Sequence, residues 1–208
     1  KKGKGYGEAL ILEYALEHSL FVHQCDFLVK ITGRLKLLNV NSMIGFHRYI
    51  LPHCDIQSEM DRRERYSDSR MLITDKGFLQ HSFLARKERI DDSKGCNFEH
   101  ILFTSIDEQK DFVFYPFLIR PLWRGISGTN GGEYWEGNYT SLKLAYFKRM
   151  LNCMTEYNMC HPHNKPSMGV RLVLGMAGMA VGTVLRFFDW IKPVSYTHLR
   201  AHETTLHL

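Results

Sequence analysis

The segment CDFLVKITGR (residues 25–34) is a near-continuous apolar run, which is typical of a parallel strand that is buried on both faces. Lys30 interrupts the run with a charge, and Gly33 ends it. The preceding segment, GKGYGEALILEYALEHS (residues 3–19), has apolar residues at helical spacing, so we expect a glycine loop and then a helix that begins near Gly7. A helix followed by a buried strand is half of a β-α-β unit, and the sequence therefore predicts an α/β fold.

The rest of the chain alternates between helix-like and strand-like segments. Residues 70–74 and 111–119 have strand chemistry, although Pro116 argues for an edge or a break in the latter, and residues 35–50 fit either a short strand or a helix. The remaining segments are predicted to be helices at 77–90, 98–106 and 141–152, a polar turn at 91–95, a solvated connection at 57–69 and a loop at 125–135.

The composition is that of an ordinary folded protein. Of the 208 residues, 44% are hydrophobic and 24% are charged, which argues against a disordered chain and against a polytopic membrane protein. The net charge of +5 comes from basic residues scattered among acidic ones, so a nucleic-acid partner is not expected. The five cysteines form an odd set without paired short spacing, which favours the reducing cytoplasm as the location.

The two ends lead us to expect three regions. The chain opens directly into its glycine run, so we expect the α/β domain, residues 1–160, to be truncated at the N-terminus. An apolar helical tail is expected at residues 161–193. The sequence VSYTHLRAHET (residues 194–204) corresponds to one reading frame of a transposase-type sequencing adapter, so residues 194–208 are expected to be non-native.

The apolar tail contains fourteen uncharged, mostly apolar residues at 172–185. This run is shorter than the roughly 20 residues that span a bilayer. It fits a peripheral contact with the inner membrane, or else an ordinary core helix.

Two groups of residues near the N-terminus have the chemistry to bind phosphate. Gly5 and Gly7 would let backbone amides approach phosphate oxygens at a helix start, although the same glycines fit a frayed terminus. Thr32 and Arg34 follow the strand at 25–34, and ligands of open α/β sheets bind beyond the carboxyl ends of strands. Arg34 would hold a phosphate in a fork or, alternatively, pair with a surface carboxylate.

Five short motifs follow one another along the chain, and they are KGYGEALILEYALEHS, DFLVKITGRLKLLN, SDSRMLITDKGF, DDSKGCNFEHIL and RGISGTNGGEY. In this order they resemble bacterial surface-polysaccharide glycosyltransferase-like proteins, a group similar to the nucleotide-diphospho-sugar transferase superfamily, over about residues 1–152. The resemblance implies a GT-A-like (Rossmann-like) mixed sheet flanked by helices. It also implies transfer of a sugar from a nucleotide-diphosphate donor to a cell-surface polysaccharide or a lipid-linked acceptor.

The resemblance also suggests how the diphosphate would be held. Metal-dependent members carry Asp-x-Asp at the strand end for a divalent cation (Mg or Mn), whereas this chain has Thr32, Gly33 and Arg34 there. The difference argues against a cation, and no metal site is assigned. Arg34, together with Lys30, is expected to neutralise the leaving diphosphate. A second set of donor contacts, with a cation at the aspartate left open, is Asp68 and Arg70.

Glu99 is the expected general base. It stands in NFEHIL at a helix start, where many members of the superfamily place an acidic residue, and a carboxylate there can take the proton of the acceptor hydroxyl. The plainer interpretation is that Glu99 complements the dipole of its own helix. Asp91 and Asp92 are weaker candidates, since they fit turn and cap positions.

A later loop supplies the candidate acceptor contacts. Ser127, Thr129 and Asn130 lie in GISGTNGG, which would close over the donor or acceptor or would be an ordinary surface loop. The nearby aromatic residues would stack on a sugar or simply pack, and they are Trp123, Tyr134 and Trp135. The residues by themselves support only a phosphate-binding α/β domain. The alternative to an enzyme is therefore a non-catalytic nucleotide-sugar-binding or assembly protein of polysaccharide biosynthesis.

Overall fold

The structure is a computed structural model that describes residues 2–51, 53–126 and 131–135 together with Gly169, Val173 and Met176. The predicted loop residues Ser127, Thr129 and Asn130 lie outside the described residues. So do the predicted helix at 141–152, nearly all of the apolar tail and residues 194–208.

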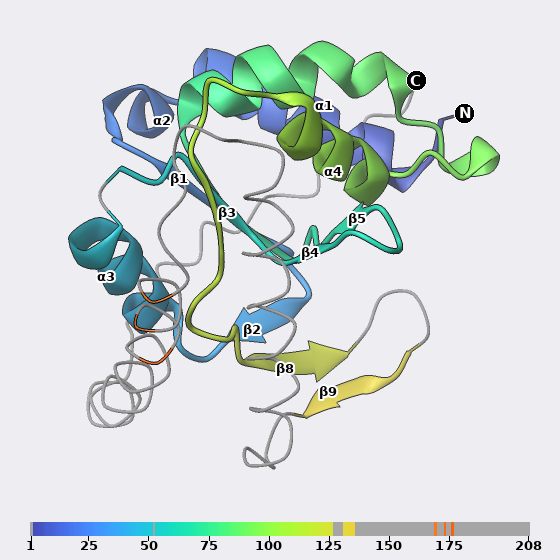
Figure 1. Cartoon of the computed structure of the whole chain (residues 1–208). Coiled ribbons are helices and arrows are strands. Elements are labelled where there is room, and N and C mark those ends of the chain that lie inside the picture. The colour runs from blue at the N-terminus through green and yellow to red at the C-terminus, as the bar shows by residue number, and fades with distance from the viewer. Residues whose placement is uncertain are drawn as a thin grey trace.

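The centre of the fold is a four-stranded mixed sheet (Figure 1). Its two antiparallel pairs join β6 to β1 on one side and to β3 on the other, whereas β3 and β7 are parallel. The strand order across the sheet is β1 (Leu28–Ile31), β6 (Met71–Thr74), β3 (Ile56–Ser58) and β7 (Phe114–Pro116). The expected edge position of the segment with Pro116 is confirmed, because β7 lies at one end of this order.

The parallel pairing predicted for the first strand is wrong, because β1 is an antiparallel edge strand that is only partly buried. Its apolar run has a different cause. Leu28 packs against the apolar cluster on one side of the sheet, and Val29 and Ile31 pack against the cluster on the other side. In β1, the continuous apolar run indicates that both faces of the strand pack against apolar residues. It does not indicate whether the strand is parallel or antiparallel to its neighbour.

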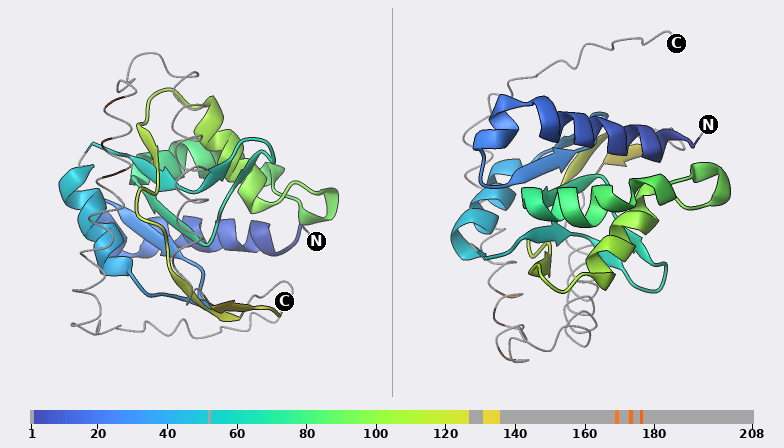
Figure 2. Two further views of the ribbon diagram at one scale, coloured as in Figure 1. Left: turned by 60° about the horizontal axis from the view of Figure 1, so that its bottom comes forward. Right: turned by 90° about the horizontal axis from the view of Figure 1, so that it is seen from above.

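Helices cover both faces of the sheet, which confirms a mixed α/β architecture. One face packs against α1 (Lys4–His18), η1 (Phe78–Phe83), η2 (Leu84–Arg89) and α4 (Phe98–Glu108). The other face packs against α3 (Val40–Ile50). The short helix α2 (Leu20–Gln24) joins α1 to β1. In the right-hand view of Figure 2, α1 (blue) lies next to the helical segment of η1 and η2 (green), and both α1 and η2 also contact α4.

Central strand β6 shows how the sheet supplies both cores. Leu72 is buried in the cluster under α1 and α4, whereas Met71 and Ile73 are buried in the cluster under α3. Successive strand residues point to opposite faces, so one apolar strand serves two layers. The strand predicted at residues 70–74 and the helix predicted at 98–106 are confirmed.

Two small antiparallel units were not predicted. The expected loop at 125–135 contributes to a three-stranded sheet, and the expected solvated connection at 57–69 contains a hairpin with buried Ser67. The segment 35–50, which fitted either element, contains a strand and then helix α3. The strands are β2 (Leu35–Leu37), β8 (Trp123–Ile126), β9 (Glu133–Trp135), and in the hairpin β4 (Met60–Asp61) and β5 (Tyr66–Ser67).

Helix α1 begins at Lys4, so the prediction of a glycine loop with a helix start near Gly7 is wrong. The cause is a cap from a distant segment. Asp92, in the 3₁₀ turn η3 (Asp92–Lys94), accepts a hydrogen bond from the Gly5 amide at 3.0 Å. A carboxylate at this end satisfies an unpaired amide and the helix dipole, so the helix extends back through the glycines.

The two glycines of α1 have different surroundings, and alanine substitutions should change stability in opposite directions. A Cβ on Gly5 would lie 3.0 Å from the backbone nitrogen of Phe98, whereas a Cβ on Gly7 would have no heavy atom within 4 Å. We expect Gly7→Ala to raise the free energy of unfolding by about 0.5–1 kcal/mol, because alanine favours helix. Gly5→Ala should lower it despite the same propensity gain. Urea unfolding of both variants is the measurement, and equal shifts would contradict this packing.

Candidate functional site

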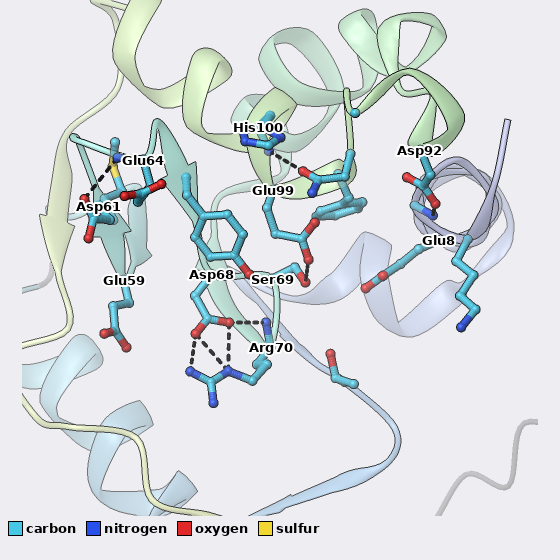
Figure 3. Close-up of a pocket in the computed structure, with 18 of the residues that line it drawn as sticks. Glu8, Glu59, Asp61, Glu64, Asp68, Ser69, Arg70, Asp92, Glu99 and His100 are labelled. Carbon is cyan, nitrogen blue, oxygen red and sulfur yellow. Dashed lines mark hydrogen bonds and ion pairs between the residues drawn. The ribbon is translucent and has the colours of Figure 1, made fainter. Parts of the chain in front are cut away.

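A cleft of about 1140 Å³ lies where the N-terminal ends of α1 and α4 meet the end of β1 and the β4–β5 hairpin (Figure 3). It is large enough for a drug-sized or nucleotide-sized ligand. Six of the eight predicted donor and catalytic residues within the described chain line this cleft, and they are Gly5, Thr32, Arg34, Asp68, Arg70 and Glu99. Gly7 and Lys30 are not part of the lining.

Glu99 reaches the cleft from the first turn of α4. The helix is capped by Asn97, whose side chain accepts the His100 amide at 3.0 Å, and this cap fixes where Glu99 projects. Ser69 donates its hydroxyl to Glu99 Oε1 at 2.5 Å. The other carboxylate oxygen, Oε2, has no hydrogen-bond partner among the described residues. Glu99 therefore occupies a favourable place in the helix dipole and also offers an oxygen to the cleft.

Lys30 lies beneath the cleft floor. Its side chain is only 10% exposed, and its ammonium pairs with Glu8 and donates to the backbone oxygen of Ser69. The same ammonium lies 5.2 Å from the centre of the Phe98 ring. Lys30 thus ties strand β1 to α1, to the β5–β6 connection and to α4. This position supports the floor, and it differs from the diphosphate contact that the sequence suggested.

Asp68 and Arg70 form a pair on the cleft wall. Both Asp68 oxygens accept Arg70 Nε, at 3.0 and 2.8 Å, and Oδ2 also accepts Nη2. Oδ1 accepts the Arg70 backbone amide at 2.8 Å. The Arg70 guanidinium lies 5.7 Å from the centre of the Trp123 ring, which is buried in the core. Of the two interpretations of Trp123, packing is therefore the one that the structure bears out.

The charges of the lining are mostly negative. Three basic residues, Lys4, Arg34 and Arg70, share the cleft with seven carboxylates. Arg34 and Lys4 are exposed, and neither forms an ion pair with any residue in the described part of the chain. The alternative interpretation of Arg34 was an ion pair with a surface carboxylate, and no carboxylate among the described residues forms that pair. The carboxylates are Glu8, Glu59, Asp61, Glu64, Asp68, Asp92 and Glu99.

The end of β1 does not have the donor set of a cation site. Thr32 and Arg34 line the cleft there, and a guanidinium repels a divalent cation. Within residues 2–51, 53–126 and 131–135, no group of three or more His, Cys, Asp or Glu side chains is arranged to hold a metal. The Gly5 amide is also engaged, since it donates to Asp92. The side chains of Thr32 and Arg34, rather than the Gly5 amide, are the polar groups that face the cleft at this end.

The two weaker base candidates have structural roles in the described chain. Asp91 accepts hydrogen bonds from Ser93 and forms an ion pair with Lys94. These contacts hold the pKa of Asp91 below its ordinary value. Asp91 does not line the cleft. Asp92 does, but one of its oxygens caps helix α1 through Gly5. Both residues thus act as the turn and cap groups that their sequence context suggested.

Sequence reasoning missed several residues of the site, above all Glu8 and Ser69. Glu8 was read as an ordinary helix position, whereas Lys4 was expected to add positive charge beside the glycines and does line the cleft. Ser69 had a usable signal, because it stands between the two candidates Asp68 and Arg70. Its partner, Glu99, is thirty residues away, and no local pattern indicates that contact.

Comparison with protein-family models, with curated proteins and with solved structures gives no match for this chain. Among the described residues, no helix has the length and apolar character needed to cross a membrane. Function is therefore inferred from the residues that line the cleft.

Replacing Lys30 with methionine should destabilise the fold. The substitution keeps the length of the side chain but removes the ammonium that holds Glu8 and the Ser69 carbonyl. We expect the free energy of unfolding to fall by about 1–3 kcal/mol, as measured by urea unfolding.

The matched control for this substitution is Lys94→Met. Lys94 also forms an ion pair, at 3.1 Å with Asp91, but its side chain is 77% exposed, so the expected change is within about 0.5 kcal/mol. Equal losses in the two variants would show that Lys30 has no special role beneath the cleft.

Proposed function

We propose that the chain is a glycosyltransferase whose cleft binds a nucleotide-diphosphate sugar. The observation that carries this proposal is the joint placement of a carboxylate and two basic side chains that have no ion-pair partner among the described residues. Glu99 presents its Oε2 in the same cleft that Arg34 and Lys4 line. An acid–base group and phosphate-binding groups in one cavity are what transfer from a phosphate leaving group requires.

Arg34 and Lys4 are the donor-binding groups in this proposal. A guanidinium can donate two parallel hydrogen bonds to phosphate oxygens, and no described carboxylate competes for Arg34. Lys4 is the first residue of α1, and its exposed ammonium adds a positive charge to the cleft beside Arg34. The polar turn with Thr32 and Arg34 follows strand β1, and both residues line the cleft.

Glu99 is the proposed general base. In the transfer step, an acceptor hydroxyl oxygen forms a bond to the anomeric carbon while the bond from that carbon to the diphosphate oxygen breaks. The hydroxyl proton passes to Glu99 Oε2, and the electron pair leaves with the diphosphate. Arg34 and Lys4 stabilise the negative charge that develops on the leaving group.

The GT-A-like fold is part of this proposal. Its support is the mixed sheet with helices on both faces and a cleft at the end of β1. The acceptor, expected to be a glycan or lipid-linked molecule, would enter from the side of the cleft away from the donor phosphates. A cytoplasmic location and contact with the inner membrane remain predictions. The tail residues Val173 and Met176 are exposed.

Glu99→Gln should sharply reduce transfer without loss of donor binding. The amide cannot accept the proton, so we expect turnover to fall about 10²- to 10⁴-fold while the donor dissociation constant stays unchanged. The assay uses the full chain with a panel of uridine, guanosine and thymidine diphosphate sugars, with calorimetry for binding.

Glu108→Gln is the matched control, because Glu108 is exposed at the opposite end of α4. Donor binding by the unsubstituted chain without turnover toward any acceptor would instead favour a non-catalytic nucleotide-sugar-binding or assembly protein. Absence of both binding and turnover would refute the proposal.

Arg34→Ala should weaken donor binding on the order of 10- to 100-fold, because a charge-assisted contact to phosphate is lost. The effect should shrink as salt is raised, since the contact is exposed. Calorimetric titration with the donor measures both changes. The control is Arg89→Ala, an exposed arginine that does not line the cleft. If the two variants bind the donor equally well, Arg34 does not contact phosphate.

A further inference from the structure

We propose that Ser69 is the positioning residue for the Glu99 carboxylate. This inference rests on the proposed function, in which Glu99 is the base. Ser69 Oγ donates to Glu99 Oε1 at 2.5 Å, and the contact joins the β5–β6 connection to the first turn of α4 (Figure 3). Ser69 does not need to touch the substrate in order to act, since its effect passes through Glu99.

The backbone around Ser69 is fixed from three sides. Its own carbonyl accepts the buried Lys30 ammonium. On one flank, the Asp68 amide donates to the Glu59 carbonyl at 2.8 Å. On the other flank, the Arg70 carbonyl accepts the Thr32 amide at 2.9 Å. Ser69 is itself only 8% exposed. These contacts hold the backbone, and therefore Cβ, of Ser69 in one position, from which its hydroxyl reaches Glu99 Oε1.

The two carboxylate oxygens of Glu99 differ in their contacts. Oε1 receives the Ser69 hydrogen bond, which stops rotation of the carboxylate, whereas Oε2 has no partner among the described residues. Oε2 is thus the oxygen available to an acceptor hydroxyl. Transfer is sensitive to the placement of the base, because small errors of orientation at the reacting atoms reduce the rate strongly.

The first test compares Ser69→Ala, Ser69→Thr and Ser67→Ala in the full chain. Ser69→Ala should lower kcat on the order of 10- to 100-fold with the donor KM nearly unchanged, because the base is present but no longer oriented. Ser69→Thr keeps a hydroxyl and should recover most of the rate. Ser67→Ala is the matched control, since Ser67 is buried two residues away and its hydroxyl lies 2.7 Å from that of Ser58.

A double substitution separates positioning from general damage to the fold. If Ser69 acts only through the carboxylate, Ser69→Ala should cost little further activity in the Glu99→Gln background. A full additive loss in the double variant would overturn the proposal, as would a kcat for Ser69→Ala equal to that of the unsubstituted chain.

A measurement that does not depend on turnover tests the same contact if the proposed function fails. Carbodiimide with an amine nucleophile labels accessible carboxyl groups, and peptide mass spectrometry can follow Glu99. Loss of the Ser69 hydrogen bond should speed this labelling several-fold relative to Ser67→Ala. Unchanged labelling would overturn the positioning role. Faster labelling in a chain that transfers no sugar would support the contact while refuting the enzyme.

Discussion

The buried ammonium of Lys30 is the contact on which the rest of the site depends. It is the charge that interrupts an apolar strand, and its burial is tolerated because Glu8 pairs with it and the Ser69 carbonyl accepts from it. These partners come from different parts of the chain, as does the Phe98 ring beside it. One side chain thereby sets the distances between the end of β1, helix α1, the segment before β6 and the start of α4.

Local patterns predicted the elements that local chemistry controls. The α4 helix and strand β6 follow from periodicity and apolar content, and Arg34 and Glu99 were placed correctly beside the ends of their elements. The errors have non-local causes. The start of α1 depends on Asp92, nearly ninety residues away, and the direction of β1 depends on which strand lies beside it. The two small antiparallel sheets form only because β4 meets β5 and β8 meets β2 and β9. The contact of Ser69 likewise depends on Glu99, a residue that is distant in the sequence.

The charge pattern of the cleft limits how an anionic ligand can be oriented. Carboxylates outnumber basic side chains there, so among the described lining residues the surroundings of Arg34 and Lys4 are the most favourable for a phosphate. Sugar hydroxyls, by contrast, can donate to carboxylate oxygens. A ligand with a negatively charged group at one end and hydroxyls at the other would therefore place the charged end near Arg34 and Lys4 and the hydroxyls near the carboxylates. The paired Asp68 and Arg70 add little net field, because each neutralises the other.

The cap on helix α1 has a thermodynamic consequence. Asp92 lines the cleft and also holds the Gly5 amide, so one carboxylate belongs both to the cleft wall and to the first turn of a helix. Fraying of that turn and reshaping of the cleft wall are therefore linked equilibria. Any ligand that binds only the intact wall must also protect the helix end from opening, and the helix end in turn must contribute to ligand affinity by the same free energy.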